Sequence, residues 1–139
     1  MIAEARRQGW SVEIAFGQIY ADKTDDPLVS DTVLSAAGAL LTKRLRAEDL
    51  KGYWGKDKVI VAFRNEDLGT VNGLVRKVGD ELASMQLPGA PGQEFCAGIG
   101  FGVAQFPNDA ESLHELMSLA DQRLQEVTKR LPAEKPVNA

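Results

Sequence analysis

Cysteine and histidine are almost absent from this chain, and their scarcity excludes several kinds of site. The 139 residues include one cysteine, Cys96, so neither an intramolecular disulfide nor a cysteine metal cluster can form. The single histidine, His114, excludes any site that needs two imidazoles. No apolar run approaches the roughly 18–20 residues of a membrane span, and the first residues lack the apolar core of a signal peptide. We therefore expect a cytoplasmic domain that makes no membrane contact.

The charge balance also lacks the excess of basic residues that nucleic-acid binding requires. Sixteen Lys and Arg residues stand against 20 Asp and Glu, which gives a formal net charge of −4. This balance argues against a general nucleic-acid binder. Hydrophobic residues make up 44% and charged residues 26%, as in ordinary globular proteins. We expect one domain over residues 1–131, followed by a polar tail or linker over 132–139.

The first long element predicted is a strand over residues 11–19. Val12, Ile14 and Phe16 alternate with other residues, which puts them on one side of the strand, and Glu13 lies on the opposite side.

The other elements follow from glycine and proline positions and from apolar periodicity. They are a short helix over 2–8, a loop over 23–28, a helix capped by Ser30 or Asp31 and ending near 46, strands over 50–54 and 58–63 joined by a hairpin, a helix over 68–82, a loop over 87–93, a glycine-rich strand over 94–106, and a helix that begins at Asn108 or Asp109.

After the short first helix, this order reads β-α-β-β-α-β-α, which predicts an α+β fold of palm or ferredoxin-like type. Such a fold has a mainly antiparallel central sheet with surrounding helices. We expect the helices on one face of the sheet and the other face free to build a site. The glycines of the strand over 94–106 predict a central strand with another backbone packed closely over it.

Several blocks of the sequence resemble the GGDEF domain, the diguanylate cyclase module of bacteria. The family pattern is R-x-x-D, five residues, then G-G-[D/E]-E-F, and this chain has R-A-E-D at 46–49, five residues, then G-K-D-K-V at 55–59. The segments at 30–34, 98–107 and 113–124 are similar to three further family blocks, in the same order. The resemblance covers residues 9–130 and implies a nucleotide cyclase fold. The family's D-x-L-T-G-L-x-N-R opening segment is missing.

Cyclase chemistry joins two GTP molecules and needs a divalent metal held by carboxylate oxygens. The resemblance places one such carboxylate at Asp57 and another at the end of the first strand. Counting from Gly9 puts Gln18 at the first-strand position, whereas counting back from Asp31 without a gap puts Ile14 there. Neither residue is a carboxylate. A solvated hairpin residue is therefore the favoured interpretation of Asp57, and we expect no metal site.

The rest of the family's catalytic set is also depleted. Gly55 keeps the first signature glycine, but Lys56 replaces the second glycine and Lys58 replaces the usual glutamate. The last helix lacks the lysine and arginine of the family's A-K-x-x-G-R-N pattern. Asp31, at the family's guanine-contacting position, is the main residue of this set that the sequence retains. The sequence thus predicts a catalytically inactive remnant with no catalytic residue and no required cofactor.

The R-x-x-D motif, by contrast, is intact. In the family it forms the inhibitory site that binds the product, cyclic di-GMP. Arg46 can donate two parallel hydrogen bonds to guanine or to a phosphate, and Asp49 can accept from the guanine edge. The resemblance implies a further arginine on the following helix, for which Arg76 is the best candidate by spacing, with Lys77 beside it. Arg44 could also reach the phosphates of the ligand.

The sequence therefore predicts a cyclic di-GMP receptor that acts through a homodimer or through other domains of a signalling protein. A common alternative for Arg46 and Asp49 is a solvated ion pair of little energetic value. The alternative function is a nucleotide-independent interaction or dimerisation module. A third hypothesis, an unusual enzyme or GTP-binding site, would use Asp57 and Asp31.

Overall fold

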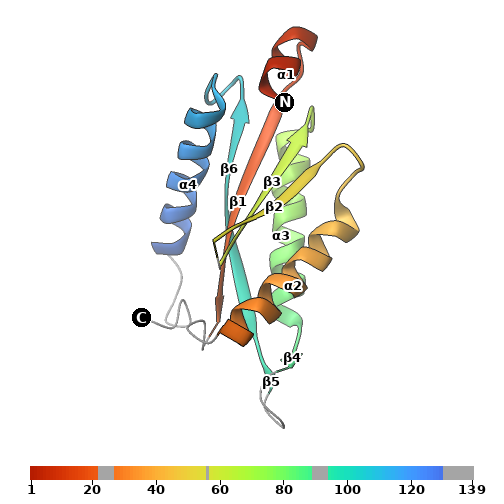
Figure 1. Cartoon of the computed structure of the whole chain (residues 1–139), viewed down its shortest axis with the longest axis vertical. Helices are drawn as coiled ribbons and strands as arrows, with labels where there is room; N and C mark the ends of the chain where they lie inside the picture. The colour runs from red at the N-terminus through yellow and green to blue at the C-terminus, as the bar shows by residue number, and fades with distance from the viewer. Residues whose placement is uncertain (22–26, 56, 89–93, 130–139) are drawn as a thin grey trace.

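The computed structural model describes the chain except residues 22–26, 56, 89–93 and 130–139, and Figure 1 shows its elements. The expected boundary at residue 131 lies outside the described residues. The elements are α1 (Ile2–Gln8), β1 (Val12–Ala21), α2 (Pro27–Arg44), β2 (Leu50–Trp54), β3 (Lys58–Arg64), α3 (Leu68–Ser84), β4 (Leu87–Pro88), β5 (Glu94–Phe95), β6 (Ala97–Phe106) and α4 (Leu113–Lys129).

The main sheet has the strand order β2-β3-β1-β6, and every neighbouring pair in it is antiparallel. With the two-stranded sheet of β4 and β5 set aside, this is the ferredoxin-like arrangement predicted from the element order. The predicted fold class is therefore confirmed. The strand expected over 94–106 is divided into β5 and β6, and part of the expected loop over 87–93 is β4.

The glycine-rich strand β6 lies at an edge of the sheet, so its predicted central position is wrong. The close approach of another backbone is nevertheless present. A Cβ at Gly102 would lie 2.1 Å from the carbonyl oxygen of Ala120 and 2.3 Å from the backbone nitrogen of Leu124, both in α4. The glycine therefore indicates that α4 packs closely on β6. It does not indicate the position of β6 in the strand order.

Helices cover both faces of the sheet, which corrects the expectation of helices on one face only. Helices α2 and α3 pack on one face, and α4 and α1 pack on the other (Figure 1). Strand β1 serves both layers, since Val12, Ile14 and Phe16 belong to the α4 layer whereas Ala15 and Ile19 belong to the α2–α3 layer. Because α4 lies over β1 and β6, it leaves the β2–β3 part of its face uncovered.

Two helices begin at places other than those predicted. Helix α2 begins at Pro27, several residues before Ser30, because proline is well tolerated in a first helical turn. Helix α4 begins at Leu113, after Ser112, whose side-chain oxygen accepts a hydrogen bond from the Glu115 backbone nitrogen at 3.2 Å. None of the described helices is long and apolar enough to span a membrane.

Candidate functional site

The β2–β3 hairpin brings Asp57 beside the end of β1. The Asp57 carbonyl accepts a hydrogen bond from the Ile19 backbone nitrogen at 2.9 Å. The side-chain nitrogen of Gln18 donates to Asp57 Oδ2 at 3.2 Å. Ile14 is instead buried in the layer under α4. Of the two candidates for the first-strand position, Gln18 is therefore the one that lies next to the hairpin carboxylate.

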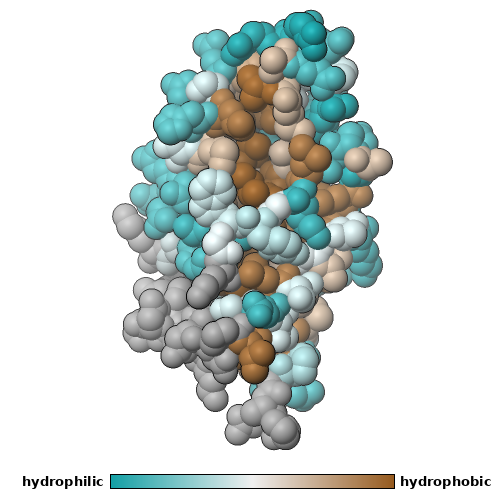
Figure 2. All heavy atoms as spheres, in the orientation of Figure 1, coloured by the Kyte–Doolittle hydropathy of each residue, from teal (hydrophilic) through white to brown (hydrophobic). Residues whose placement is uncertain are grey.

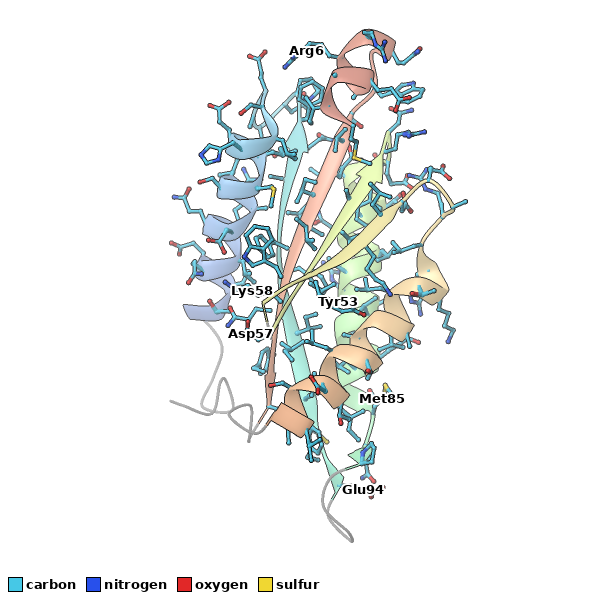
Figure 3. All side chains as sticks on the ribbon, viewed as in Figure 1. Arg6, Tyr53, Asp57, Lys58, Met85 and Glu94 are labelled. Atoms are coloured by element: carbon cyan, nitrogen blue, oxygen red, sulfur yellow. The ribbon has the colours of Figure 1, made fainter. Side chains whose placement is uncertain are left out.

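Among the described residues, few groups near Asp57 could hold a cation. The Gln18 amide directs an N–H at a carboxylate oxygen that a metal would need. Lys58, the next residue, places its ammonium 5.7 Å from the centroid of the Phe16 ring, and Figure 3 shows Asp57 and Lys58 together at the hairpin end. Over the described residues, no group of three or more His, Cys, Asp or Glu side chains could hold a metal ion.

The other predicted remnants are less informative. Gly55 adopts a positive φ of 72° at the hairpin, a backbone conformation that glycine adopts without strain. Lys56 lies outside the described residues. Asp31 is exposed on α2.

The turn between α2 and β2 contains the R-x-x-D motif, in which Arg46 and Asp49 bind each other. We call this pair of residues the clamp. The Arg46 backbone nitrogen donates to Asp49 Oδ2 at 2.8 Å, and Arg46 Nη2 donates to Asp49 Oδ1 at 3.0 Å. Arg46 Nη2 also donates to the carbonyl oxygen of Arg64 at 2.8 Å, which ties the turn to the end of β3. Only 2% of the Asp49 side chain is exposed, against 36% for Arg46. The carboxylate therefore faces inward and the guanidinium reaches the surface.

Further carboxylates surround the outer part of the Arg46 guanidinium. Arg46 Nη1 lies 3.3 Å from Glu48 Oε2 and 3.5 Å from Glu66 Oε2. The hydrogen bond that Arg46 donates to Asp49 is the largest cause of a raised pKa of Arg46, and the negative charges of Asp49, Glu66 and Glu48 add to it. Arg46 is thus permanently charged and held in one orientation.

The structure does not bring Arg76 to this turn. Arg76 lines a separate cavity of about 620 Å³ together with residues of β1, β6 and α4, such as Tyr20, Gly98 and Val127. Within the described chain, no hydrogen bond or ion pair joins Arg76 to Arg46 or Asp49.

Lys77, next to Arg76, belongs to a basic group at the α2–α3 contact. Arg44 Nε donates to Glu81 Oε1 at 3.0 Å. This hydrogen bond is the largest cause of a lowered pKa of Glu81, to which the positive charges of Arg44, Lys43 and Lys77 contribute. We call Lys43, Arg44 and Lys77 the basic group. It adjoins the clamp, because Arg44 is two residues before Arg46.

Sequence reasoning missed the part played by Glu13. Its side chain is fully buried and accepts hydrogen bonds from the Glu66 backbone nitrogen and from Gln105 Nε2, both at 2.9 Å. This buried carboxylate holds the loop that carries Glu66 near Arg46. The only available signal was one acidic residue within an otherwise apolar strand.

The family follows from a model of the diguanylate cyclase GGDEF domain, which matches residues 27–131 and so more than half of the chain. The chain belongs to the GGDEF family. The match includes the hairpin, the clamp and α4. No curated protein is similar enough in sequence to this GGDEF domain to count as a match.

Solved GGDEF structures from bacteria have the same fold. An EAL/GGDEF protein from M. capsulatus is 25% identical, with a TM-score of 0.75 over 89% of this chain and 82% of that one. The GGDEF domain of DgcB from Caulobacter crescentus, in complex with c-di-GMP, is 18% identical, with a TM-score of 0.78 over 99% and 84%. The diguanylate cyclase SiaD from Pseudomonas aeruginosa, in complex with its activator SiaC, is 19% identical, with a TM-score of 0.77 over 92% and 50%. The last two likenesses concern the fold alone.

Proposed function

We propose that this GGDEF domain makes no cyclic di-GMP and instead binds it as a receptor through Arg46. The observation that carries the proposal is the orientation of the guanidinium. Asp49 and the Arg64 carbonyl fix Nε and Nη2, while Nη1 makes only ion pairs, at 3.3 Å with Glu48 and at 3.5 Å with Glu66. A pre-oriented guanidinium whose Nη1 can exchange these carboxylates for a ligand suits the phosphate or the guanine edge of cyclic di-GMP.

The lack of catalysis rests on the hairpin. Cyclase chemistry needs hard oxygen ligands for a divalent metal, and Gln18 supplies an amide where a second carboxylate would be required. Lys58 adds a positive charge next to Asp57, which further disfavours a bound cation.

Binding would use the clamp and the basic group together. Arg46 Nη1 contacts the ligand, and the charges of Arg44 and Lys77 raise the local positive potential at the α2–α3 contact. Asp49 acts as a positioning residue, because its carboxylate is occupied by Arg46. We propose that Lys77, the neighbour of Arg76 on α3, supplies the positive charge that the sequence prediction assigned to Arg76.

The biological output would be a change of assembly. A ligand that binds one arrangement of two domains better than another shifts the population toward it. The partner is a second copy of this domain or another domain of a cytoplasmic signalling protein. DgcB with c-di-GMP and SiaD with SiaC are relatives seen with a nucleotide and with a partner protein, respectively.

Calorimetric titration of cyclic di-GMP into the domain tests the proposal. We expect micromolar binding that Arg46→Ala weakens at least about tenfold, a loss of about 1.4 kcal/mol. Arg7→Ala is the matched control, because Arg7 is an exposed arginine on α1 and should leave the affinity unchanged. Equal binding by Arg46→Ala would place the ligand elsewhere. Formation of cyclic di-GMP from GTP with Mg²⁺ or Mn²⁺ would overturn the inactivity.

A protein-interaction module is the second candidate function. Strand β2 is an edge strand that exposes three large apolar side chains, with 59% of Leu50, 53% of Tyr53 and 55% of Trp54 accessible. Exposed edges and apolar side chains of this kind are typical of pairing surfaces. A folded domain that binds no cyclic di-GMP would favour this function.

A further inference from the structure

The outer side of the Arg46 guanidinium, which would meet a ligand, is covered by two glutamates of the chain itself. Nη1 lies 3.3 Å from Glu48 Oε2 and 3.5 Å from Glu66 Oε2. Both distances exceed the roughly 2.7–2.9 Å that is usual for a hydrogen bond between an N–H cation and a carboxylate. The two carboxylates therefore cover Nη1 loosely. We call Glu48 and Glu66 the acidic pair.

The inner side of the same guanidinium is held firmly. Nη2 donates to Asp49 Oδ1 at 3.0 Å and to the Arg64 carbonyl oxygen at 2.8 Å. Only 2% of the Asp49 side chain is accessible, so a ligand in solution does not reach this carboxylate. A ligand therefore approaches Arg46 from the side of Nη1, where it must replace the acidic pair.

The two members of the acidic pair are held differently. Glu66 Oε1 accepts a hydrogen bond from the Asp67 backbone nitrogen, and the Glu66 backbone nitrogen donates to the buried Glu13 carboxylate, both at 2.9 Å. Glu66 is thus fixed at its backbone and at its side chain. Among the residues that the structure describes, Arg46 alone pairs with the Glu48 carboxylate, and 41% of the Glu48 side chain is accessible. Glu48 can therefore rotate away from Nη1, whereas Glu66 stays beside it.

The carboxylates of Asp49, Glu48 and Glu66 surround one guanidinium, so negative charge exceeds positive charge around Nη1. An anionic group that approaches Nη1 is attracted by Arg46 and repelled by the acidic pair. Figure 2 shows hydrophilic side chains along most of the outline of the upper half of the molecule, where Figure 1 places the turn between α2 and β2. The repulsion therefore acts close to solvent, where salt screens it.

The basic group attracts a phosphate from another direction and leaves this repulsion in place. Arg44 Nε donates to Glu81 Oε1 at 3.0 Å, so its charge is directed toward α3. Lys43 and Lys77 act on the same carboxylate. The affinity for an anion thus depends on a balance between the basic group and the acidic pair, and the loss of one carboxylate should change it measurably.

We propose that Glu48 and Glu66 determine the affinity of the clamp, because they occupy Nη1 in the free domain and compete there with the phosphates of a ligand. This inference rests on the proposed receptor function, to which it adds an inhibitory contact made by the chain itself. Glu66 supplies the constant part of the inhibition because it is fixed. Glu48 supplies a smaller part, which rotation of its side chain relieves.

Calorimetric titration of cyclic di-GMP into charge variants of the acidic pair tests the inference. Glu66→Gln should bind about five- to tenfold more tightly than the unmodified domain, because one negative charge beside the phosphate is removed. The glutamine keeps a side-chain oxygen for the Asp67 N–H, so the loop retains its hydrogen bond. Glu48→Gln should give a smaller gain, and Glu48→Lys a larger one than Glu48→Gln, because the charge is then reversed.

Two controls separate a local charge effect from other causes. Glu126→Gln removes the same charge from an exposed position on α4 and should leave the affinity unchanged. The gain in Glu66→Gln should shrink as the salt concentration rises from about 0.05 M to about 0.5 M, since added ions screen the repulsion that the substitution removes. A purely structural role of Glu66 would instead weaken binding at every salt concentration.

Inorganic pyrophosphate distinguishes a failure of this inference from a failure of the receptor function, because it offers phosphate charge without a base. Glu66→Gln should bind pyrophosphate at least about fivefold more tightly than the unmodified domain. Arg46→Ala combined with Glu66→Gln should lose that gain. A gain for pyrophosphate, with no binding of cyclic di-GMP by any variant, would support the acidic pair and overturn the receptor function. If Glu66→Gln bound neither anion more tightly, the inference would be wrong, and binding of cyclic di-GMP by the unmodified domain would still support the receptor.

Discussion

The Arg46 clamp shows how far a spacing motif can predict a site at the scale of single residues. The motif spacing predicted that Arg46 and Asp49 would belong to one site, and in the structure the two side chains are joined by hydrogen bonds. Spacing does not determine where a carboxylate points. Asp49 is directed inward because a backbone N–H and a guanidinium both donate to it. The contact of Gln18 with Asp57 could not be predicted from the sequence either, because the sequence left Ile14 open as an alternative for the first-strand position.

A second arginine–aspartate pair, Arg123 with Asp109, gives a prediction about pH. Arg123 Nη1 donates to Asp109 Oδ2 at 3.0 Å and to the Val103 carbonyl at 2.7 Å, so the pair fastens α4 to β6. The hydrogen bond from Arg123 holds the pKa of Asp109 below its usual value. A lowered pKa stabilises the fold above the unfolded-state pKa of about 3.9, and the contribution is lost as the pH falls through the folded-state pKa.

Asp109→Asn should therefore lower the free energy of unfolding by about 1 kcal/mol near neutral pH, a value reduced by the exposure of the pair. Urea unfolding between about pH 7 and pH 3 measures this difference, which should shrink below about pH 4. Glu111→Gln is the control, because Glu111 is an exposed carboxylate on the same connection. A difference that stays constant down to pH 3 would contradict the explanation.

At the scale of elements, apolar periodicity predicted most helices and strands. It did not predict which elements pack against one another in the fold. An apolar stripe shows which face of α4 is buried, yet the same stripe would serve on either face of the sheet. The helix lies opposite α2 and α3 because β1 has apolar residues on both faces, such as Phe16 on one and Ile19 on the other. The glycines of β6 were informative about close packing and uninformative about strand order, since both edge and central strands can lie under a helix.

Gly102 provides the prediction for this contact between β6 and α4. Gly102→Ala would place a Cβ against the Ala120 carbonyl and the Leu124 nitrogen, which are backbone atoms that cannot rotate away. We expect a loss of about 3 kcal/mol or more in the free energy of unfolding, because helix and strand must separate. Gly73→Ala is the matched control within α3, where an added Cβ meets nothing within 4 Å. That control should stabilise the domain by about 0.5–1 kcal/mol, and equal effects of the two substitutions would contradict the packing argument.

At the scale of the whole molecule, one sheet separates two hydrophobic layers. The clamp lies where α2 leads into the edge strand β2. Strand β1 contributes to both layers, so neither layer can open without disturbing the strand that the other layer needs. This arrangement predicts one cooperative unfolding unit.

A matched pair of core substitutions tests that cooperativity. Leu82 in α3 and Leu124 in α4 are both fully buried, one in each layer. Leu82→Ala and Leu124→Ala should each lower the free energy of unfolding by about 2–5 kcal/mol. Each variant should show a single transition that coincides when followed by tryptophan fluorescence and by far-UV circular dichroism. If Leu124→Ala instead separated the two probes, α4 would unfold independently of α2 and α3, because β1 would then fail to couple the layers.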